Sequence, residues 1–210
     1  MFVLKNVLTS EDIKKLLDFY YLDDNLKETN ENASSKHPIW NVTDWPQHVI
    51  EKTVNSLVEE VFYLETWRGV IQVHVDSGYG KLKPTLQYLF PLVSDGGSTV
   101  FFDNYWQGNA SKFVKGKNIF DGGGNSYKRD DRITDYSKII NYNDTPFDKE
   151  IHKKYLSDVP YDNMHGLTVS DIVEWNPGDC IVWNRNQLHA SSNTHKHKIG
   201  LSVFCYQVDN

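Results

Sequence analysis

Residues 85–102 read TLQYLFPLVSDGGSTVFF, and this stretch decides the fold. The segments 85–92 and 98–102 consist mainly of apolar, aromatic and β-branched residues, which favour extended strands. The cluster Asp95-Gly96-Gly97 between them is typical of a turn. Two strands joined by a turn are therefore predicted at this point of the chain.

Similar short runs occur on both sides of this stretch. They are predicted as strands over residues 70–75, 167–174, 180–183 and 199–208. The cluster Asn176-Pro177-Gly178-Asp179 provides another turn between two of these runs. Many short strands separated by turns predict a mainly β domain.

Two helices are predicted before the strands. Thr9 and Ser10 can cap a helix that ends near Tyr20, and apolar residues at helical spacing predict a second from about Pro46 to Phe62. We expect one domain over residues 1–210, in which residues 1–66 form a helical support and residues 67–210 form the β core. Helices followed by many strands favour a helix-backed β-sandwich or jelly roll.

Residues 104–162 interrupt the rhythm of the strands. They combine glycine, tyrosine, asparagine and mixed charges without clear periodicity, and segments of this kind inside a compact domain are often binding loops or lids. We therefore expect a lid-like insertion.

The charge and the cysteines restrict the class of protein. The formal net charge of -6 gives no electrostatic reason to expect a nucleic-acid partner. No apolar run is long enough to cross a bilayer, so no membrane partner is expected. The only two cysteines, Cys180 and Cys205, lie in apolar stretches and are expected to be buried free thiols, which fits a cytoplasmic protein.

The motif Val73-His74-Val75-Asp76 ends an apolar run. Residues two apart in a strand point to the same face, so the His74 imidazole and the Asp76 carboxylate can bind one metal ion. Alone, this triplet also fits an ordinary hydrogen-bonded pair. His189 supplies a third ligand if the strands fold back, and two histidines with one carboxylate are the facial set of iron(II) oxygenases.

Lys198 lies nine residues after His189, and Ser202 follows on the same strand face. A lysine ammonium here can pair with the distal carboxylate of a keto acid, and the hydroxyl can add a hydrogen bond. A solvated lysine is the alternative. His195 and His197 form a rival pair of imidazoles, which we interpret as surface residues because no carboxylate lies among them.

Several elements in order resemble the 2-oxoglutarate and iron(II)-dependent oxygenase superfamily, in particular its prolyl-4-hydroxylase-like branch. The matching residues are His74-Val75-Asp76, 85–89, 96–101, 178–182, Leu188-His189 and Lys198. The resemblance covers roughly residues 70–206. Many members have arginine at the position of Lys198.

The resemblance implies a double-stranded β-helix, a cupin-like jelly roll, backed by the N-terminal helices. It implies that His74, Asp76 and His189 bind Fe(II) and that Lys198 binds 2-oxoglutarate; Ser202 stays a candidate from its position on the strand. Relatives often have a tyrosine on the strand that holds Tyr88, so Tyr88 is a further candidate. Strand alternation separates Tyr88 from Gln87, and the sequence does not decide which of them faces inward.

The function implied is that of a dioxygenase that uses O₂ and converts 2-oxoglutarate to succinate while it hydroxylates a substrate, with ascorbate as a stimulant. The sequence leaves a peptide, an amino acid or another small molecule open as substrate. Two alternatives remain. One is a cupin-like metalloprotein that does not use 2-oxoglutarate, and the other is a non-catalytic jelly-roll binding module.

Overall fold

The structure, a computed structural model, describes residues 1–22, 35–39, 45–66, 73–76, 84–107, 112–113, 132–133, 139–192 and 196–206. Two α-helices are described, α1 (Ser10–Leu22) and α2 (Lys149–Tyr155), and twelve strands. The strands are β1 (Phe2–Leu4), β2 (Ser35–Pro38), β3 (Leu57–Thr66), β4 (Pro84–Ser94), β5 (Ser98–Trp106), β6 (Lys112–Phe113), β7 (Arg132–Ile133), β8 (Ile139–Ile140), β9 (Val169–Glu174), β10 (Cys180–Asn184), β11 (Gln187–Ser192) and β12 (Lys198–Tyr206). The described chain is therefore mainly β, as predicted.

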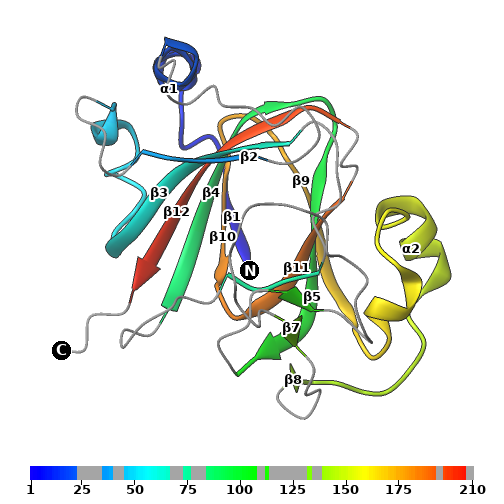
Figure 1. The fold of residues 1–210 in the computed structure, drawn as a ribbon. Coiled ribbons are helices and arrows are strands. Elements are labelled where there is room, and N and C mark those ends of the chain that lie inside the picture. The colour runs from blue at the N-terminus through cyan, green and yellow to red at the C-terminus, as the bar shows by residue number, and fades with distance from the viewer. Residues whose placement is uncertain are drawn as a thin grey trace.

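Two antiparallel sheets lie across from each other (Figure 1). The larger sheet has the order β1-β10-β4-β12-β3-β2, and the smaller has β11-β5-β8 with β9 also paired to β5. Neighbours in the larger sheet come from distant parts of the sequence: β12 pairs with both β3 and β4. This return of the last strand brings residues that follow position 198 next to residues that precede position 95.

The predicted turn at Asp95-Gly96-Gly97 joins β4 of the larger sheet to β5 of the smaller one. Gly96 has φ +97°, a left-handed conformation that glycine adopts without strain. The chain thus crosses from one sheet to the other at this glycine.

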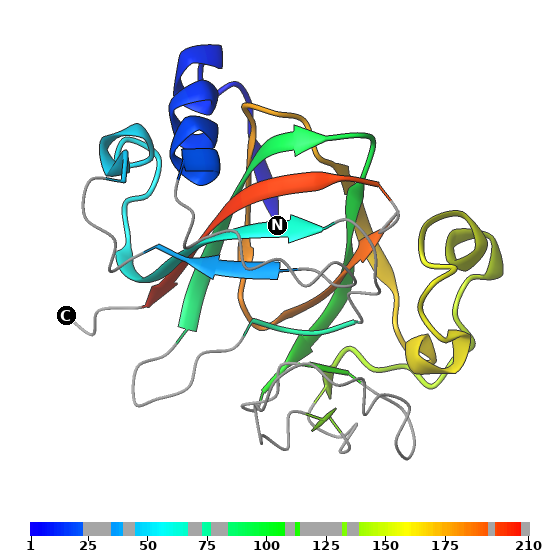
Figure 2. The same cartoon turned by 45° about the horizontal axis from the view of Figure 1, so that its top comes forward.

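Three apolar clusters stabilise the layers. One lies between α1 and the outer face of the larger sheet, where the Tyr63 hydroxyl donates to the Leu16 carbonyl at 2.7 Å (Figure 2). A second covers the outer face of the smaller sheet, and a third, which includes Phe101 and Trp183, lies between the sheets. The helix α1 confirms the first predicted helix.

The second predicted helix, over residues 46–62, is wrong. The chain forms only a short 3₁₀ turn at Gln47–Val49, and by Leu57 it has entered β3. Residues at helical spacing such as Val58 and Val61 instead pair with β12. A long-range strand pairing has overridden the local pattern, so the β sheet begins well before residue 67.

Of the predicted insertion, the described part is residues 104–107, 112–113, 132–133 and 139–162. Phe147 and Leu156 of this part pack in the cluster on the outer face of the smaller sheet, away from the space between the sheets. The remaining residues of the predicted lid lie outside the described ones. Among the helices described, none has the length and apolar character needed to span a membrane.

Candidate metal centre

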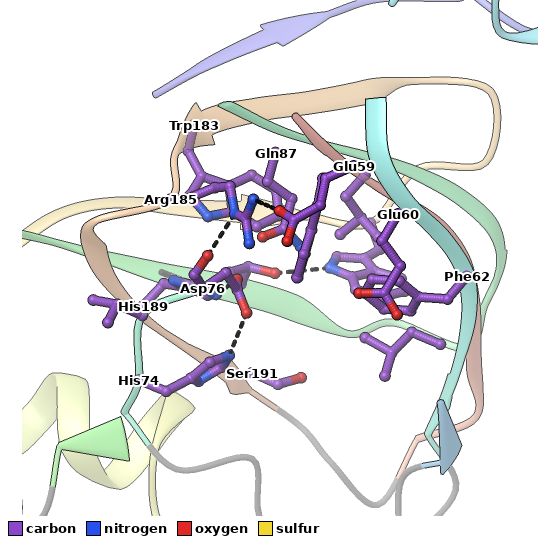
Figure 3. Close-up of a pocket in the computed structure, with 16 residues that line it drawn as sticks. Glu59, Glu60, Phe62, His74, Asp76, Gln87, Trp183, Arg185, His189 and Ser191 are labelled. Atoms are coloured by element: carbon purple, nitrogen blue, oxygen red, sulfur yellow. Dashed lines mark hydrogen bonds and ion pairs between the residues drawn. The ribbon is translucent and has the colours of Figure 1, made fainter. Parts of the chain in front are cut away.

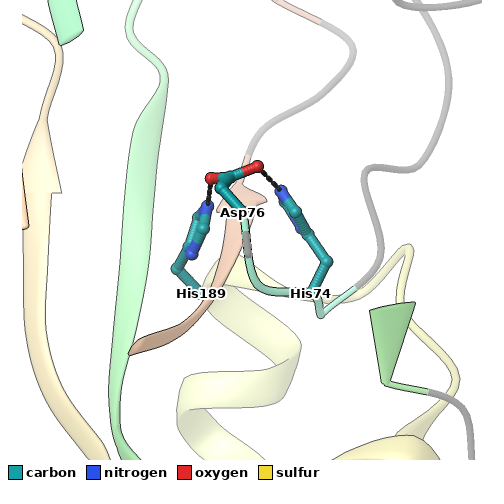
Figure 4. A group of neighbouring side chains, drawn as sticks. All are labelled: His74, Asp76 and His189. Carbon is teal, nitrogen blue, oxygen red and sulfur yellow. Dashed lines mark ion pairs between the residues drawn. The ribbon is translucent and has the colours of Figure 1, made fainter. Parts of the chain in front are cut away.

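His74, Asp76 and His189 come together at one end of the space between the sheets (Figure 4). One ligand atom from each residue lies within 4.8 Å of the other two. The Asp76 carboxylate lies between the two rings, with Oδ2 at 3.0 Å from His189 Nε2 and Oδ1 at 3.7 Å from His74 Nε2. The structure thus brings together the three residues that the sequence pattern singled out.

Backbone pairing holds the two histidines side by side. His74 N donates to the His189 carbonyl at 2.9 Å, and His189 N donates to the His74 carbonyl at 3.0 Å. Residues paired in this way have adjacent side chains on one face. The ring centroids are accordingly 4.3 Å apart.

The hydrogen bond at the far side of the His189 ring determines its tautomer. Nδ1 lies 3.0 Å from the Gln187 carbonyl oxygen, which can only accept a hydrogen bond, so Nδ1 carries the proton. In the neutral ring, Nε2 then holds the lone pair, which is directed at Asp76 and available to a metal ion, whereas in the charged ring Nε2 donates to Asp76. Phe101 and Trp183 enclose the ring, with centroids 5.9 Å and 5.2 Å away.

The Asp76 carboxylate fits a bound cation. Burial would raise the pKa of Asp76, but interactions with His189, His74 and Arg185 outweigh burial and lower the pKa to about 2. Asp76 Oδ2 is buried, yet among the described residues it accepts no hydrogen bond of good geometry. At 3.0 Å the carboxylate oxygen and Nε2 are held together by a proton on the ring or by a cation bound to both atoms, and two imidazoles with one carboxylate suit a divalent transition metal.

A cavity of about 320 Å³ extends from these residues between the two sheets (Figure 3). Most of the surface that lines it is apolar, although nine of the sixteen lining residues carry polar or charged side chains. The lining residues are Glu59, Glu60, Phe62, Leu64, His74, Val75, Asp76, Gln87, Leu89, Thr99, Trp175, Trp183, Arg185, His189, Ser191 and Phe204. A cavity of this size with a largely apolar surface and converging polar groups is typical of a small-molecule site.

Lys198 is fully buried behind one wall of this cavity. Its Nζ donates to Ser191 Oγ at 2.5 Å and to the Ser192 carbonyl at 3.1 Å, and lies 4.8 Å from the Trp175 ring centroid. Burial lowers the pKa of Lys198 to about 8. A solvated lysine at this position is therefore excluded.

Gly97 makes room for the lysine stem, because a Cβ on Gly97 would lie 2.2 Å from Lys198 Cδ. Ser202 lies four residues further along β12 and is also fully buried. Its Oγ accepts a hydrogen bond from Gln87 Nε2 at 2.8 Å, and Gln87 lines the cavity. Lys198 and Ser202 are thus adjacent to the cavity, each through one residue of its wall.

The candidate role of Tyr88 is corrected by the register of β4. Strand alternation turns Gln87 and Leu89 toward the cavity and Tyr88 to the opposite face. There Tyr88 packs in the cluster under α1, and its hydroxyl donates to Asn55 Oδ1 at 3.0 Å. Gln87 therefore takes the place that the sequence pattern left open between the two.

The rival imidazole pair is not a second metal site in the described chain. His197 Nε2 lies 3.0 Å from the buried carboxylate of Glu65, so it is half-buried rather than a surface residue. Tyr20 donates to the same carboxylate at 2.5 Å. His195 lies outside the described residues.

Arg185 and Glu59 are site residues that the sequence pattern did not reveal. Arg185 is 1% exposed and forms an ion pair with Glu59 in the wall of the cavity. The local sequence gives one indication of this role: an arginine follows directly after the buried strand β10. An arginine at such a position would ordinarily lie in a solvent-exposed turn.

No model of a known protein family matches the sequence, and no protein of curated function matches it. Solved structures do match, at low sequence identity.

One is the crystal structure of SnoN, a non-heme alpha ketoglutarate dependent epimerase from nogalamycin biosynthesis, with a TM-score of 0.52 and 11% identity over 98% of this chain and 77% of that chain. A complex of SnoN with Fe3+, alpha ketoglutarate and nogalamycin RO has a TM-score of 0.52 and 10% identity over 98% and 78% of the two chains. HygX from Streptomyces hygroscopicus, with nickel and 2-oxoglutarate bound, has a TM-score of 0.46 and 13% identity over 96% and 80%. The similarity to SnoN establishes the fold, a mainly β, cupin-like arrangement of antiparallel sheets.

Proposed function

We propose that this chain is an Fe(II)- and 2-oxoglutarate-dependent oxygenase that hydroxylates a small molecule, with His74, Asp76 and His189 as the iron ligands. The observation that carries the proposal is the convergence of two imidazoles and one ionised carboxylate at the end of a cavity between the sheets. Such a facial triad leaves the other side of the metal open to further ligands. We propose further that the chain forms one catalytic domain.

The sheet order supports this proposal. In the larger sheet β10, β4, β12 and β3 are neighbours, and in the smaller sheet β9, β5 and β11 are neighbours, with His74 bridged to β11. We interpret this arrangement as a double-stranded β-helix. The SnoN complex, which shares the fold, contains iron and alpha ketoglutarate, and this favours the same pair here. The prolyl-4-hydroxylase-like branch stays a prediction.

Lys198 is proposed as the partner of the distal carboxylate of 2-oxoglutarate. Among the described residues no carboxylate lies within ion-pair distance of its ammonium, although the group is fully buried. A buried cation of this kind is stabilised by an anionic ligand. Ser191 on β11, and Ser202 on β12 through Gln87, would add hydrogen bonds from the two sheets.

When bound, iron and 2-oxoglutarate supply the oxidising chemistry with O₂. The residues of this chain orient the two groups and exclude water. His189 keeps its proton on Nδ1 through Gln187, and Asp76 stays ionised. The apolar walls around Trp183 and Phe204 would hold the substrate away from bulk water.

A small molecule is favoured over a peptide because the cavity, at about 320 Å³, has the size of a small-molecule site, and because the SnoN complex, which shares the fold, holds the small molecule nogalamycin RO. SnoN is an epimerase, and epimerisation would leave the substrate mass unchanged whereas hydroxylation adds one oxygen atom. Mass spectrometry of the product therefore separates the two reactions.

Calorimetric titration of 2-oxoglutarate under anaerobic conditions, with Mn(II) in place of Fe(II), tests the proposed site. We expect binding that requires the metal and that is lost in Asp76→Ala. For Lys198→Met we expect about 10- to 150-fold weaker binding, the value of one hydrogen bond to a charged group. Binding that is equal with and without metal would exclude the proposal and favour a metal-independent binding module.

A further inference from the structure

We infer that Arg185, held in place by Glu59, is the positioning residue that fixes the carboxylate ligand Asp76. This inference rests on the metal site proposed above. Arg185 is not one of the three ligands, and its guanidinium would act on the metal only through Asp76 (Figure 3).

Arg185 binds the backbone of Asp76 in both directions. Its Nε donates to the Asp76 carbonyl at 2.5 Å, and its own carbonyl accepts from Asp76 N at 2.9 Å. The two histidine ligands hold each other by a reciprocal backbone pair, but Asp76 lies beyond that pair. Among the residues that the structure describes, Arg185 is the one that fixes the backbone of Asp76 on both its amide and its carbonyl side.

The guanidinium is itself held by two other strands, and the Arg185 backbone by a third. Its Nη1 forms an ion pair with Glu59 on β3 and donates to the Cys205 carbonyl on β12 at 3.4 Å. Its central carbon lies 4.1 Å from the Phe204 ring centroid, and Arg185 N donates to the Thr85 carbonyl on β4 at 3.0 Å. These contacts leave the side chain one conformation, so Nε presents a fixed donor to Asp76.

The sign of the effect on metal affinity separates positioning from simple electrostatics. A guanidinium next to a divalent cation repels it, so removal of the charge alone would strengthen metal binding. Removal of a group that orients a ligand weakens metal binding, by about 10- to 100-fold for such outer partners. The two accounts therefore predict opposite changes for the same substitution.

The test is Co(II) titration of the purified protein, followed by visible absorption, for the parent and for Arg185→Gln and Arg185→Lys. We expect about 10- to 100-fold weaker Co(II) binding and an altered absorption spectrum for Arg185→Gln. Arg185→Lys should recover only part of the affinity, because a lysine retains the charge without the fork of donors. Affinity that is unchanged or higher in Arg185→Gln would overturn the inference.

A matched pair of variants controls for the charge of the cavity wall. Glu59→Gln and Glu60→Gln each remove one negative charge from adjacent positions of β3, but Arg185 forms its ion pair with Glu59. We expect Glu59→Gln to weaken Co(II) binding more than Glu60→Gln does. Equal losses would mean that the wall acts by charge alone and would overturn the role of Glu59.

A single substitution could unfold the protein by leaving one buried charge unpaired. The double variant Glu59→Gln, Arg185→Gln removes both charges at once and keeps the test valid. It should retain the thermal unfolding midpoint better than Arg185→Gln while its Co(II) affinity stays low. If the double variant binds Co(II) as the parent does, Arg185 has no positioning role. If the parent itself binds no Co(II), the proposed metal site fails as well.

Discussion

Replacement of Lys198 by methionine should change stability in a way that depends on pH. The ammonium is fully buried, and burial lowers its pKa from 10.5 to about 8. The difference between these pKa values corresponds to about 3 kcal/mol by which protonated Lys198 destabilises the folded state. Methionine keeps an apolar stem of similar shape and removes the charge.

The sign of this pH dependence follows from which state, folded or unfolded, binds more protons. Because the pKa of Lys198 is lower in the folded state, the unfolded state binds more protons between pH 8 and 10.5, and the parent gains stability as the pH rises through this range. The variant lacks this pH-dependent contribution to stability. Lys198→Met should thus be more stable than the parent at pH 7, less any hydrogen-bond energy lost with Ser191, and this advantage should fall by about 3 kcal/mol by pH 10.5.

Urea unfolding of both proteins at intervals from pH 7 to 10.5 measures this difference. Other groups titrate in the same range, but they occur in both proteins and cancel in the comparison. Addition of metal and 2-oxoglutarate at pH 7 should reverse the order, since the ligand stabilises only a protein that binds it. A stability difference that does not vary with pH would refute the buried, unneutralised ammonium on which the proposed cosubstrate site depends.

Three further predictions concern the walls of the cavity and the core. Gly97→Ala should weaken 2-oxoglutarate binding, because the added Cβ would lie 2.2 Å from Lys198 Cδ; an unchanged dissociation constant in calorimetry would contradict this packing. Gln87→Leu should weaken the same binding while Tyr88→Phe leaves it unchanged, since the two side chains lie on opposite faces of β4; a larger effect of Tyr88→Phe would show that the register is wrong. The Cys180 and Cys205 thiols should resist a thiol reagent in the native protein and react in denaturant, because both are buried and burial raises the pKa of each to about 12; fast labelling of the folded protein would argue against their burial.

The parts of the fold that depend on local sequence were predictable. The cap and spacing of α1 and the turn at Asp95-Gly96-Gly97 are read directly from neighbouring residues, and the structure confirms both. Residues 46–62 were not predictable in this way. Their apolar residues fit a helix locally, but pairing of β3 with β12, well over a hundred residues away, determines an extended conformation.

The candidate site likewise has one part that local sequence predicts and another that depends on contacts between distant residues. The spacing of His74 and Asp76 predicts a shared face, so their proximity could be inferred; in the described residues 73–76 an isolated bridge at His74, rather than the predicted strand, brings His189 beside them. The orientation of Gln87 and Tyr88 required the register of β4. Arg185 could not be predicted as a site residue, because its partners, Asp76 and Glu59, lie 109 and 126 residues from it in sequence.

The most direct test of the central claim is succinate formation from 2-oxoglutarate under air, with Fe(II) and ascorbate, in the parent protein and in a His74→Ala, Asp76→Ala double variant. The account predicts slow, iron-dependent succinate formation in the parent even without the substrate, and none in the variant. If the parent forms no succinate and shows no iron-dependent 2-oxoglutarate binding, or if the double variant is as active as the parent, the assignment of this site to an iron oxygenase is contradicted.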